Sequence, residues 1–109
     1  MIARLWSART TAALSHLYLD HFRQSVQPNL SKVAGYAGAT VLTRLMPQGI
    51  EILVTTLWQS YDAIDAFAGP DRESAVVAAE AAALLTDFDR RVRHYEIAVA
   101  DVPTNFLIS

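Results

Sequence analysis

A tight turn between two strand-like runs is the feature that most limits what this chain can fold into. The turn spans residues 46–49 (Met-Pro-Gln-Gly), where the proline fixes φ at the second position and the glycine fits the last. Residues 36–45 and 50–59 on either side are rich in β-branched and apolar side chains. Two such runs joined by so short a turn pair as an antiparallel hairpin, so the sequence predicts an antiparallel sheet.

Further elements are predicted on both sides of this hairpin. Residues 2–9 form an expected strand, and a helix follows that Pro28 is expected to end near residue 27. Ser60 is placed to cap a short helix that stops at Gly69, and Asp71 to cap another whose apolar stripe reaches Phe88. Residues 92–100 form the last expected strand. The order β-α-β-β-α-β predicts an α+β, ferredoxin-like fold with a four-stranded antiparallel sheet.

Composition narrows the class of protein. The 109 residues suffice for one domain, expected over residues 1–100, with residues 101–109 as a tail that docks on a partner subunit. The net charge of −2 and the absence of a basic cluster argue against nucleic-acid binding. No apolar run reaches the ~20 residues of a membrane span. The chain has no cysteine, which excludes disulfides and thiolate metal sites and fits a cytoplasmic location.

Alternation along the strands divides the expected sheet into two faces. The smaller, aliphatic set is predicted to pack on the helices: Ala3, Leu5, Leu53, Thr55, Leu57, Tyr95, Ile97 and Val99. The other set is predicted to form the open face: Arg4, Trp6, Thr56, Trp58, His94 and Glu96. A second copy covering that face would create a semi-polar barrel interior, a common place for a small-molecule ligand. The sequence therefore predicts a homodimer.

Several stretches resemble the antibiotic biosynthesis monooxygenase family. They are MIARLWSART, PNLSKVAGYAGATVL, EILVTTLWQSYDAIDAFAG and FDRRVRHYEI, and the similarity covers residues 1–99. The most recognisable piece is the strand ending in Leu57-Trp58-Gln59-Ser60. The resemblance implies a dimeric α/β barrel. It also implies membership of a superfamily of cofactor-free quinone-forming monooxygenases, haem-degrading enzymes, isomerases and cyclases, so it implies no single activity.

The residues argue against the haem-degrading branch. Its pattern has an asparagine on the first strand, where this chain has none, and a tryptophan where Phe67 stands. Its iron-binding histidine falls near residues 75–77, which are Ala-Val-Val. Haem binding through His94 stays open. No metal site and no cofactor are predicted, because carboxylates with ligand spacing and a glycine-rich phosphate loop are both missing.

The leading hypothesis is a cofactor-independent monooxygenase that acts on a small aromatic or phenolic compound. His94 would take a proton from the substrate, and Arg4 would stabilise the resulting anion. Trp6 and Trp58 would stack on a flat substrate, with Thr56 and Glu96 also binding it. Some of these residues also have a purely structural alternative. His94 would be hydrogen-bonded inside the barrel, Arg4 would form an ion pair with Glu96 or Glu51, and Trp58 would be a core or interface anchor.

Two other classes of function fit the same residues. One is a small-molecule binding protein without catalysis. The other is an isomerase, cyclase or lyase that uses His94 and Arg4 for proton transfer alone. Consumption of dioxygen would separate the monooxygenase from the second, and turnover of any kind would separate both enzymes from the first.

Overall fold

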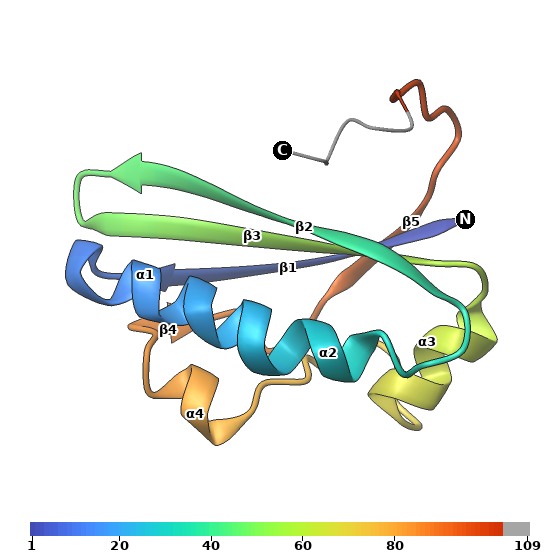
Figure 1. The fold of residues 1–109 in the computed structure, drawn as a ribbon, viewed down its shortest axis with the longest axis horizontal. Helices are drawn as coiled ribbons and strands as arrows, with labels where there is room; N and C mark the ends of the chain where they lie inside the picture. Colours follow the sequence, from blue (N-terminus) through green and yellow to red (C-terminus); the bar gives the residue numbers. More distant parts are fainter. Residues whose placement is uncertain (104–109) are drawn as a thin grey trace.

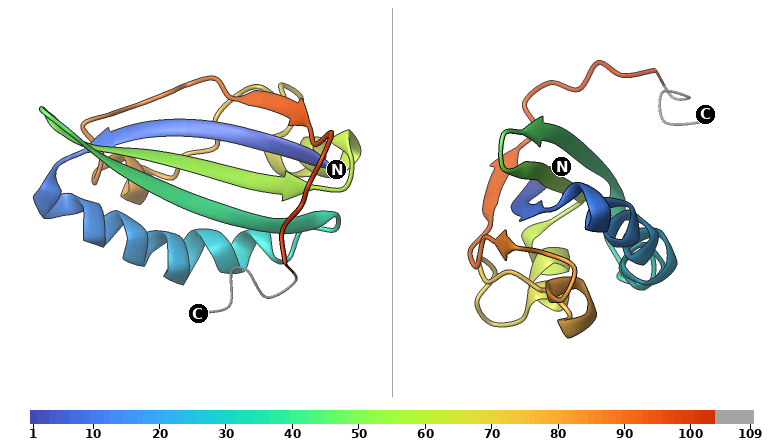
Figure 2. Two further views of the ribbon diagram at one scale, coloured as in Figure 1. Left: turned by 90° about the horizontal axis from the view of Figure 1, so that it is seen from above. Right: turned by 90° about the vertical axis from the view of Figure 1, so that its left-hand side faces the viewer.

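One antiparallel sheet carries the fold, and the four α-helices within residues 1–103 lie on the same face of it (Figures 1 and 2). The computed structural model describes residues 1–103. The strands are β1 (Ile2–Thr10), β2 (Tyr36–Met46), β3 (Gly49–Trp58), β4 (Asp87–Phe88) and β5 (Arg93–Glu96). The helices are α1 (Ala12–His21), α2 (Gln27–Leu30), α3 (Tyr61–Ala68) and α4 (Ala79–Ala82), with a π-helical segment (Phe22–Val26) between α1 and α2. The strand order is β2-β3-β1, followed by β4 and β5 along the free edge of β1.

The predicted α+β, ferredoxin-like architecture is confirmed. β2 and β3 form the expected hairpin, and β3 also pairs with β1 over the whole length of that strand. The last strand predicted over residues 92–100 is present but shorter, as β5, and the additional short strand β4 pairs with the same edge of β1. The sheet is therefore five-stranded rather than four-stranded, with the ferredoxin-like order retained.

Pro28 does not end the first helix as predicted. The N–H of Gln27 donates to the carbonyl of Phe22, which is the i to i−5 bond of a π-helix. The wider turn comes immediately before Pro28, and the helix then continues as α2 to Leu30. A proline removes a helical N–H and crowds the preceding turn, so a π segment just before it is a physical way to absorb it.

The helix predicted from Asp71 to Phe88 is reduced to the single turn α4. The backbone of residues 73–75 bonds to residues 90–92 instead: the N–H of Ala75 donates to the Arg90 carbonyl, and the N–H of Val92 donates to the Glu73 carbonyl. These bonds satisfy groups that a helix would otherwise pair with one another. An extended segment consequently lies where the sequence predicted the first turns of a helix.

The assignment of the two sheet faces is opposite to the prediction. Ile52 and Trp58 are completely buried beneath the helices, together with Arg4, which is 4% exposed. The set predicted to pack on the helices faces away from them, and Tyr95 of that set is 51% exposed. The buried face is the one on which distant segments supply carbonyls for the Arg4 guanidinium and aromatic rings around Trp58. Four of the predicted site residues therefore lie between the sheet and the helices of one subunit, namely Arg4, Trp6, Thr56 and Trp58.

Two features of the chain ends complete the description. Residues 101–103 have no regular secondary structure, and the rest of the tail predicted to dock on a partner lies outside the described residues. The boundary between domain and tail remains a prediction. No helix within residues 1–103 is both long and apolar enough to cross a membrane.

Gly35 provides a test of how tightly α3 packs below the sheet. Gly35 and Gly69 both have positive φ (90° and 87°), but a β-carbon on Gly35 would lie 2.5 Å from that of Ala63, whereas one on Gly69 would meet no atom within 4 Å. We expect Gly69→Ala to lower the free energy of unfolding by about 1 kcal/mol through backbone strain. Gly35→Ala should cost a further ~1–3 kcal/mol through overlap. Urea denaturation measures both, and equal losses would contradict the packing.

Candidate functional site

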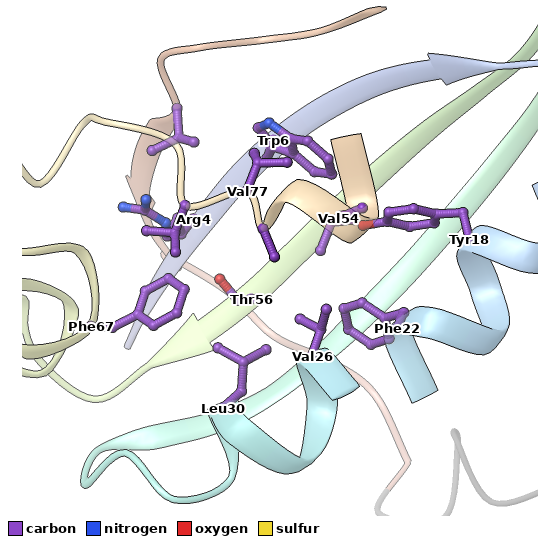
Figure 3. Close-up of a pocket in the computed structure, with 14 residues that line it drawn as sticks. Arg4, Trp6, Tyr18, Phe22, Val26, Leu30, Val54, Thr56, Phe67 and Val77 are labelled. Carbon is purple, nitrogen blue, oxygen red and sulfur yellow. The ribbon is translucent and has the colours of Figure 1, made fainter. Parts of the chain in front are cut away.

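A cavity lies between the sheet and the helices, as Figure 3 shows. The space open to the centre of a water molecule is about 80 Å³, several times the ~10–15 Å³ that one ordered water needs. Most of its lining is apolar, and the polar side chains in it come from three residues: Arg4, Thr56 and Tyr18. An apolar cavity with a few convergent polar groups is the usual form of a small-molecule site.

Arg4 contributes a buried cation to this cavity. Its Nη2 donates to the Ser74 carbonyl (2.8 Å) and its Nη1 donates to the Arg72 carbonyl. Burial lowers the pKa of Arg4 to about 10, which still leaves it charged at neutral pH. Within residues 1–103 no carboxylate forms an ion pair with it. The predicted partners Glu51 and Glu96 do not reach it; Glu51 pairs with Arg44.

His94 lies behind Arg4 and does not line the cavity. Arg4 Nη1 is 3.0 Å from His94 Nε2. A guanidinium has no acceptor, so Nε2 must accept this bond, and the neutral imidazole carries its proton on Nδ1. Burial, followed by the nearby charges of Arg4 and Arg72, lowers the pKa of His94. The predicted pair does come together, but His94 contacts Arg4 rather than the cavity.

Trp6 and Thr56 line the cavity as neighbours of Arg4. The indole N–H of Trp6 donates to the Asp89 carbonyl (2.8 Å), so the ring presents only apolar surface to the cavity. Thr56 is the cross-strand partner of Arg4, and its hydroxyl oxygen accepts a bond from the Trp58 indole (2.8 Å). Both residues are therefore placed to contact a ligand.

Trp58 and Glu96 are not placed to do so. Trp58 is fully buried between Tyr36 and Phe67, with its ring stacked on Phe67 at a centroid distance of 5.3 Å. It acts as a core anchor that holds one cavity residue, Phe67, in place. Glu96 is exposed at the end of β5, opposite Ile2.

Sequence reasoning missed the helical side of the cavity. Tyr18, Phe22, Val26 and Leu30 line it from α1, the π-helical segment and α2. Their regular spacing of four residues marks one helix stripe, which is the sequence signal that locates them. Across the cavity from them, Val76 and Val77 line it from the irregular segment before α4.

The described side chains form no cluster of three or more His, Cys, Asp or Glu that would hold a metal ion. The polar lining of the cavity contains no carboxylate and no imidazole. What the arrangement offers is a fixed positive charge at one point of an otherwise apolar, helix-covered space. Such a charge stabilises an anionic oxygen of a ligand more strongly than it would in water.

Comparison with known proteins identifies the fold. No protein-family model matches the sequence, and no curated protein matches it. Solved structures do match over 94% of the chain. A Bacillus cereus protein named for antibiotic biosynthesis monooxygenases has 15% sequence identity and a TM-score of 0.62, with 97% of its own chain covered. The chain has the fold of the antibiotic biosynthesis monooxygenases.

Two further structures with this monooxygenase fold contain small ligands. The ActVA-Orf6 monooxygenase of Streptomyces coelicolor, bound to nanaomycin D, is 19% identical, with a TM-score of 0.61 and 92% of its chain covered. A mutant of MhuD with two manganese protoporphyrin IX molecules per active site is 14% identical, with a TM-score of 0.63 and all of its chain covered. At these identities the likeness establishes the fold of the present chain and not its ligand.

The His94–Arg4 contact predicts a pH dependence of stability. The pKa of His94 is lowered in the folded chain, so the unfolded chain binds this proton first. The stabilisation is therefore complete above pH ~6.5 and decreases as the pH falls through the lowered pKa. His94→Gln keeps an acceptor for Arg4 without titrating. We expect wild type to lose more unfolding free energy than His94→Gln between pH ~7 and ~5 in urea titrations, and parallel curves would contradict the contact.

Proposed function

We propose that this protein binds a flat aromatic molecule through an acidic hydroxyl group and oxygenates it with dioxygen, without a cofactor. The observation that carries the proposal is the buried guanidinium of Arg4, which has no carboxylate partner within the described chain and borders an apolar cavity. A buried charge without a counterion is costly, so an anionic ligand oxygen relieves a cost that the free protein carries. The monooxygenase fold supports the oxygen chemistry.

The chemistry needs little from the protein beyond this charge. Arg4 lowers the pKa of the bound hydroxyl group and holds the phenolate, whose ring is electron-rich enough to react with dioxygen. A phenol and dioxygen give a quinone and water, in which one oxygen atom enters the ring and the other leaves in the water. This balance requires no external reductant. The helices and Val77, which cover the cavity side of the sheet, exclude bulk water from the reacting ring.

His94 has a different role in this proposal from the one predicted from sequence. Because its Nε2 accepts a bond from Arg4, it is a positioning residue that fixes the guanidinium, and it is not the base that contacts the substrate. Arg72 and Asp65 form a salt bridge nearby, and the Arg72 guanidinium also lies over the Tyr61 ring. The Tyr61 ring in turn contacts His94 edge-on. This surface cluster holds the imidazole from the other side.

Binding without catalysis is the second candidate. It is favoured by the absence of any acid–base residue from the cavity lining of the described chain apart from Arg4 and Tyr18. The same observation weakens the isomerase, cyclase and lyase alternatives, which depend on proton transfer by the protein. Oxygen uptake distinguishes the two leading candidates. The predicted cytoplasmic location remains a prediction.

Replacement of Arg4 tests the proposed function. We expect bound 2-naphthol to lose its proton at a lower pH than free 2-naphthol, and the fluorescence of the naphthol measures this shift. We also expect the protein to consume dioxygen when 1-naphthol is added, which an oxygen electrode measures. Arg4→Met should weaken binding by at least about tenfold, the size of a charged hydrogen bond, and abolish both effects.

Arg23→Met is the matched control, because Arg23 is exposed on the helical surface and, among residues 1–103, pairs only with Asp20. Circular dichroism verifies that both variants fold. Binding that survives Arg4→Met unchanged would refute the oxyanion site. Arg4-dependent binding without oxygen uptake would leave the second candidate, ligand binding, in its place.

The sheet face that none of the helices within residues 1–103 covers, the uncovered sheet face, supports the predicted homodimer, and it is not the face expected from sequence. Leu42, Leu53 and Leu57 lie on it with Leu5 and Tyr95, and Leu42 is 54% exposed. We propose that two copies pair through this face, since apolar side chains on adjacent strands make a continuous surface that water disfavours. The candidate cavity would then lie outside the interface, on the opposite side of each sheet.

Two exposed leucines provide a matched test of this dimer. Leu42→Asp places a charge on the uncovered sheet face, whereas Leu17→Asp places one on α1, where Leu17 is 42% exposed. We expect wild type and Leu17→Asp to sediment as dimers at micromolar concentration and Leu42→Asp as a monomer, because an unpaired buried charge is strongly unfavourable. A monomeric wild type would overturn the proposed assembly.

A further inference from the structure

A tyrosine hydroxyl in the cavity has no partner within residues 1–103. Tyr18 is 3% exposed and lies over Trp6, with ring centroids 6.3 Å apart. In Figure 3 its oxygen points from α1 into the cavity. Burial alone raises its pKa to about 12, so the hydroxyl keeps its proton and is a donor. The residue as a whole is buried, but the hydroxyl oxygen itself is open to the cavity, where a ligand can pair with it.

The spacing of residues along the strands sets the distance between this hydroxyl and Arg4. Arg4 pairs with Thr56 across β1 and β3, and the next pair on the same face is Trp6 with Val54. Alternate residues of a strand are ~7 Å apart. Tyr18 lies over that second pair, so its hydroxyl and the guanidinium lie on either side of an apolar floor (Figure 3). The cavity is therefore polar at one end, apolar in the middle and polar again at Tyr18.

We propose that Tyr18 is the second anchor of the ligand and donates a hydrogen bond to an oxygen at the end of the molecule away from Arg4. The proposal rests on the proposed function and narrows its substrate class. That class is flat molecules of about two fused rings, with an acidic hydroxyl at one end and an acceptor oxygen, hydroxyl or carbonyl, at the other. Molecules with oxygen at one end only leave the Tyr18 hydroxyl unpaired, which costs affinity.

This role differs from simple packing in what it predicts. If Tyr18 only fills space, its hydroxyl contributes nothing to ligand choice, and Tyr18→Phe leaves the relative affinities of two ligands unchanged. If the hydroxyl binds the far oxygen, the same substitution removes a preference without weakening the hold of Arg4 on the near oxygen. The ratio of two affinities is thus the informative quantity.

The test compares 2-naphthol with naphthalene-2,6-diol, which differs only in a second hydroxyl at the far end. The diol can bind in two equivalent orientations, which alone gives a twofold advantage. Beyond that factor, we expect wild type to bind the diol about fivefold to tenfold more tightly than 2-naphthol, the effect of one hydrogen bond. Tyr18→Phe should lose that preference, because it has no hydroxyl to pair with the far oxygen of the diol or to leave unpaired against 2-naphthol. Tyr36→Phe, which removes a hydroxyl outside the cavity lining, should keep it. Fluorescence titration measures all the affinities.

A mutation-free comparison guards against a variant that fails to fold. Wild type should also prefer the diol to 6-methyl-2-naphthol, which fills the same space without a hydrogen bond. Arg4-dependent binding of all three naphthols with no preference for the diol, or a preference that persists in Tyr18→Phe, would overturn the role of Tyr18 and leave the oxyanion site intact. Failure of every naphthol to bind wild type would overturn the oxyanion site, and the second anchor with it.

Discussion

The burial of the Arg4 guanidinium is the constraint on which the site depends. Its hydrogen bonds to the carbonyls of Arg72 and Ser74 hold the extended segment before α4 against β1, and its bond to His94 holds β5. Phe67 of α3 lies beneath it, with the guanidinium carbon 5.5 Å from the ring centroid. These contacts offset part of the desolvation cost of the cation, but they supply no negative charge. The Arg4 end of the cavity is therefore well ordered, but its positive charge has no negative partner within residues 1–103.

Local sequence signals located the elements whose partners are close in the chain. The hairpin of β2 and β3 follows from its turn, and α3 begins where the Ser60 side chain accepts from the N–H of Ala63 (3.2 Å). The helix predicted from Asp71 failed for a non-local reason. An alanine-rich stretch favours a helix by propensity, but the backbone groups of residues 73–75 find partners in residues 90–92. Tertiary pairing of this kind overrides helix propensity, and a short window of sequence contains no signal of it.

Strand alternation predicted the part of the candidate site that lies on the sheet. Arg4, Trp6 and Thr56 were placed on one face together, and they do line one cavity. Which face the helices cover was not predictable in the same way, because both faces of β1 and β3 mix apolar and polar side chains. The buried face is settled by contacts from distant segments, namely the carbonyls that satisfy Arg4 and the aromatic rings around Trp58. Tyr18 lines the cavity from α1, and alternation along strands carries no information about a helix.

The protonation state of His94 links the structure to the chemistry. A neutral imidazole accepts from Arg4 and lets the guanidinium carry the only net charge that the lining residues within 1–103 place at that end of the cavity. A protonated imidazole would lose its acceptor and place a second positive charge beside Arg4, close to Arg72. The lowered pKa of His94 thus favours the state in which Arg4 is held. A substrate that supplies its own acidic hydroxyl fits such a site well, because the protein has only to stabilise the anion and need not provide a base.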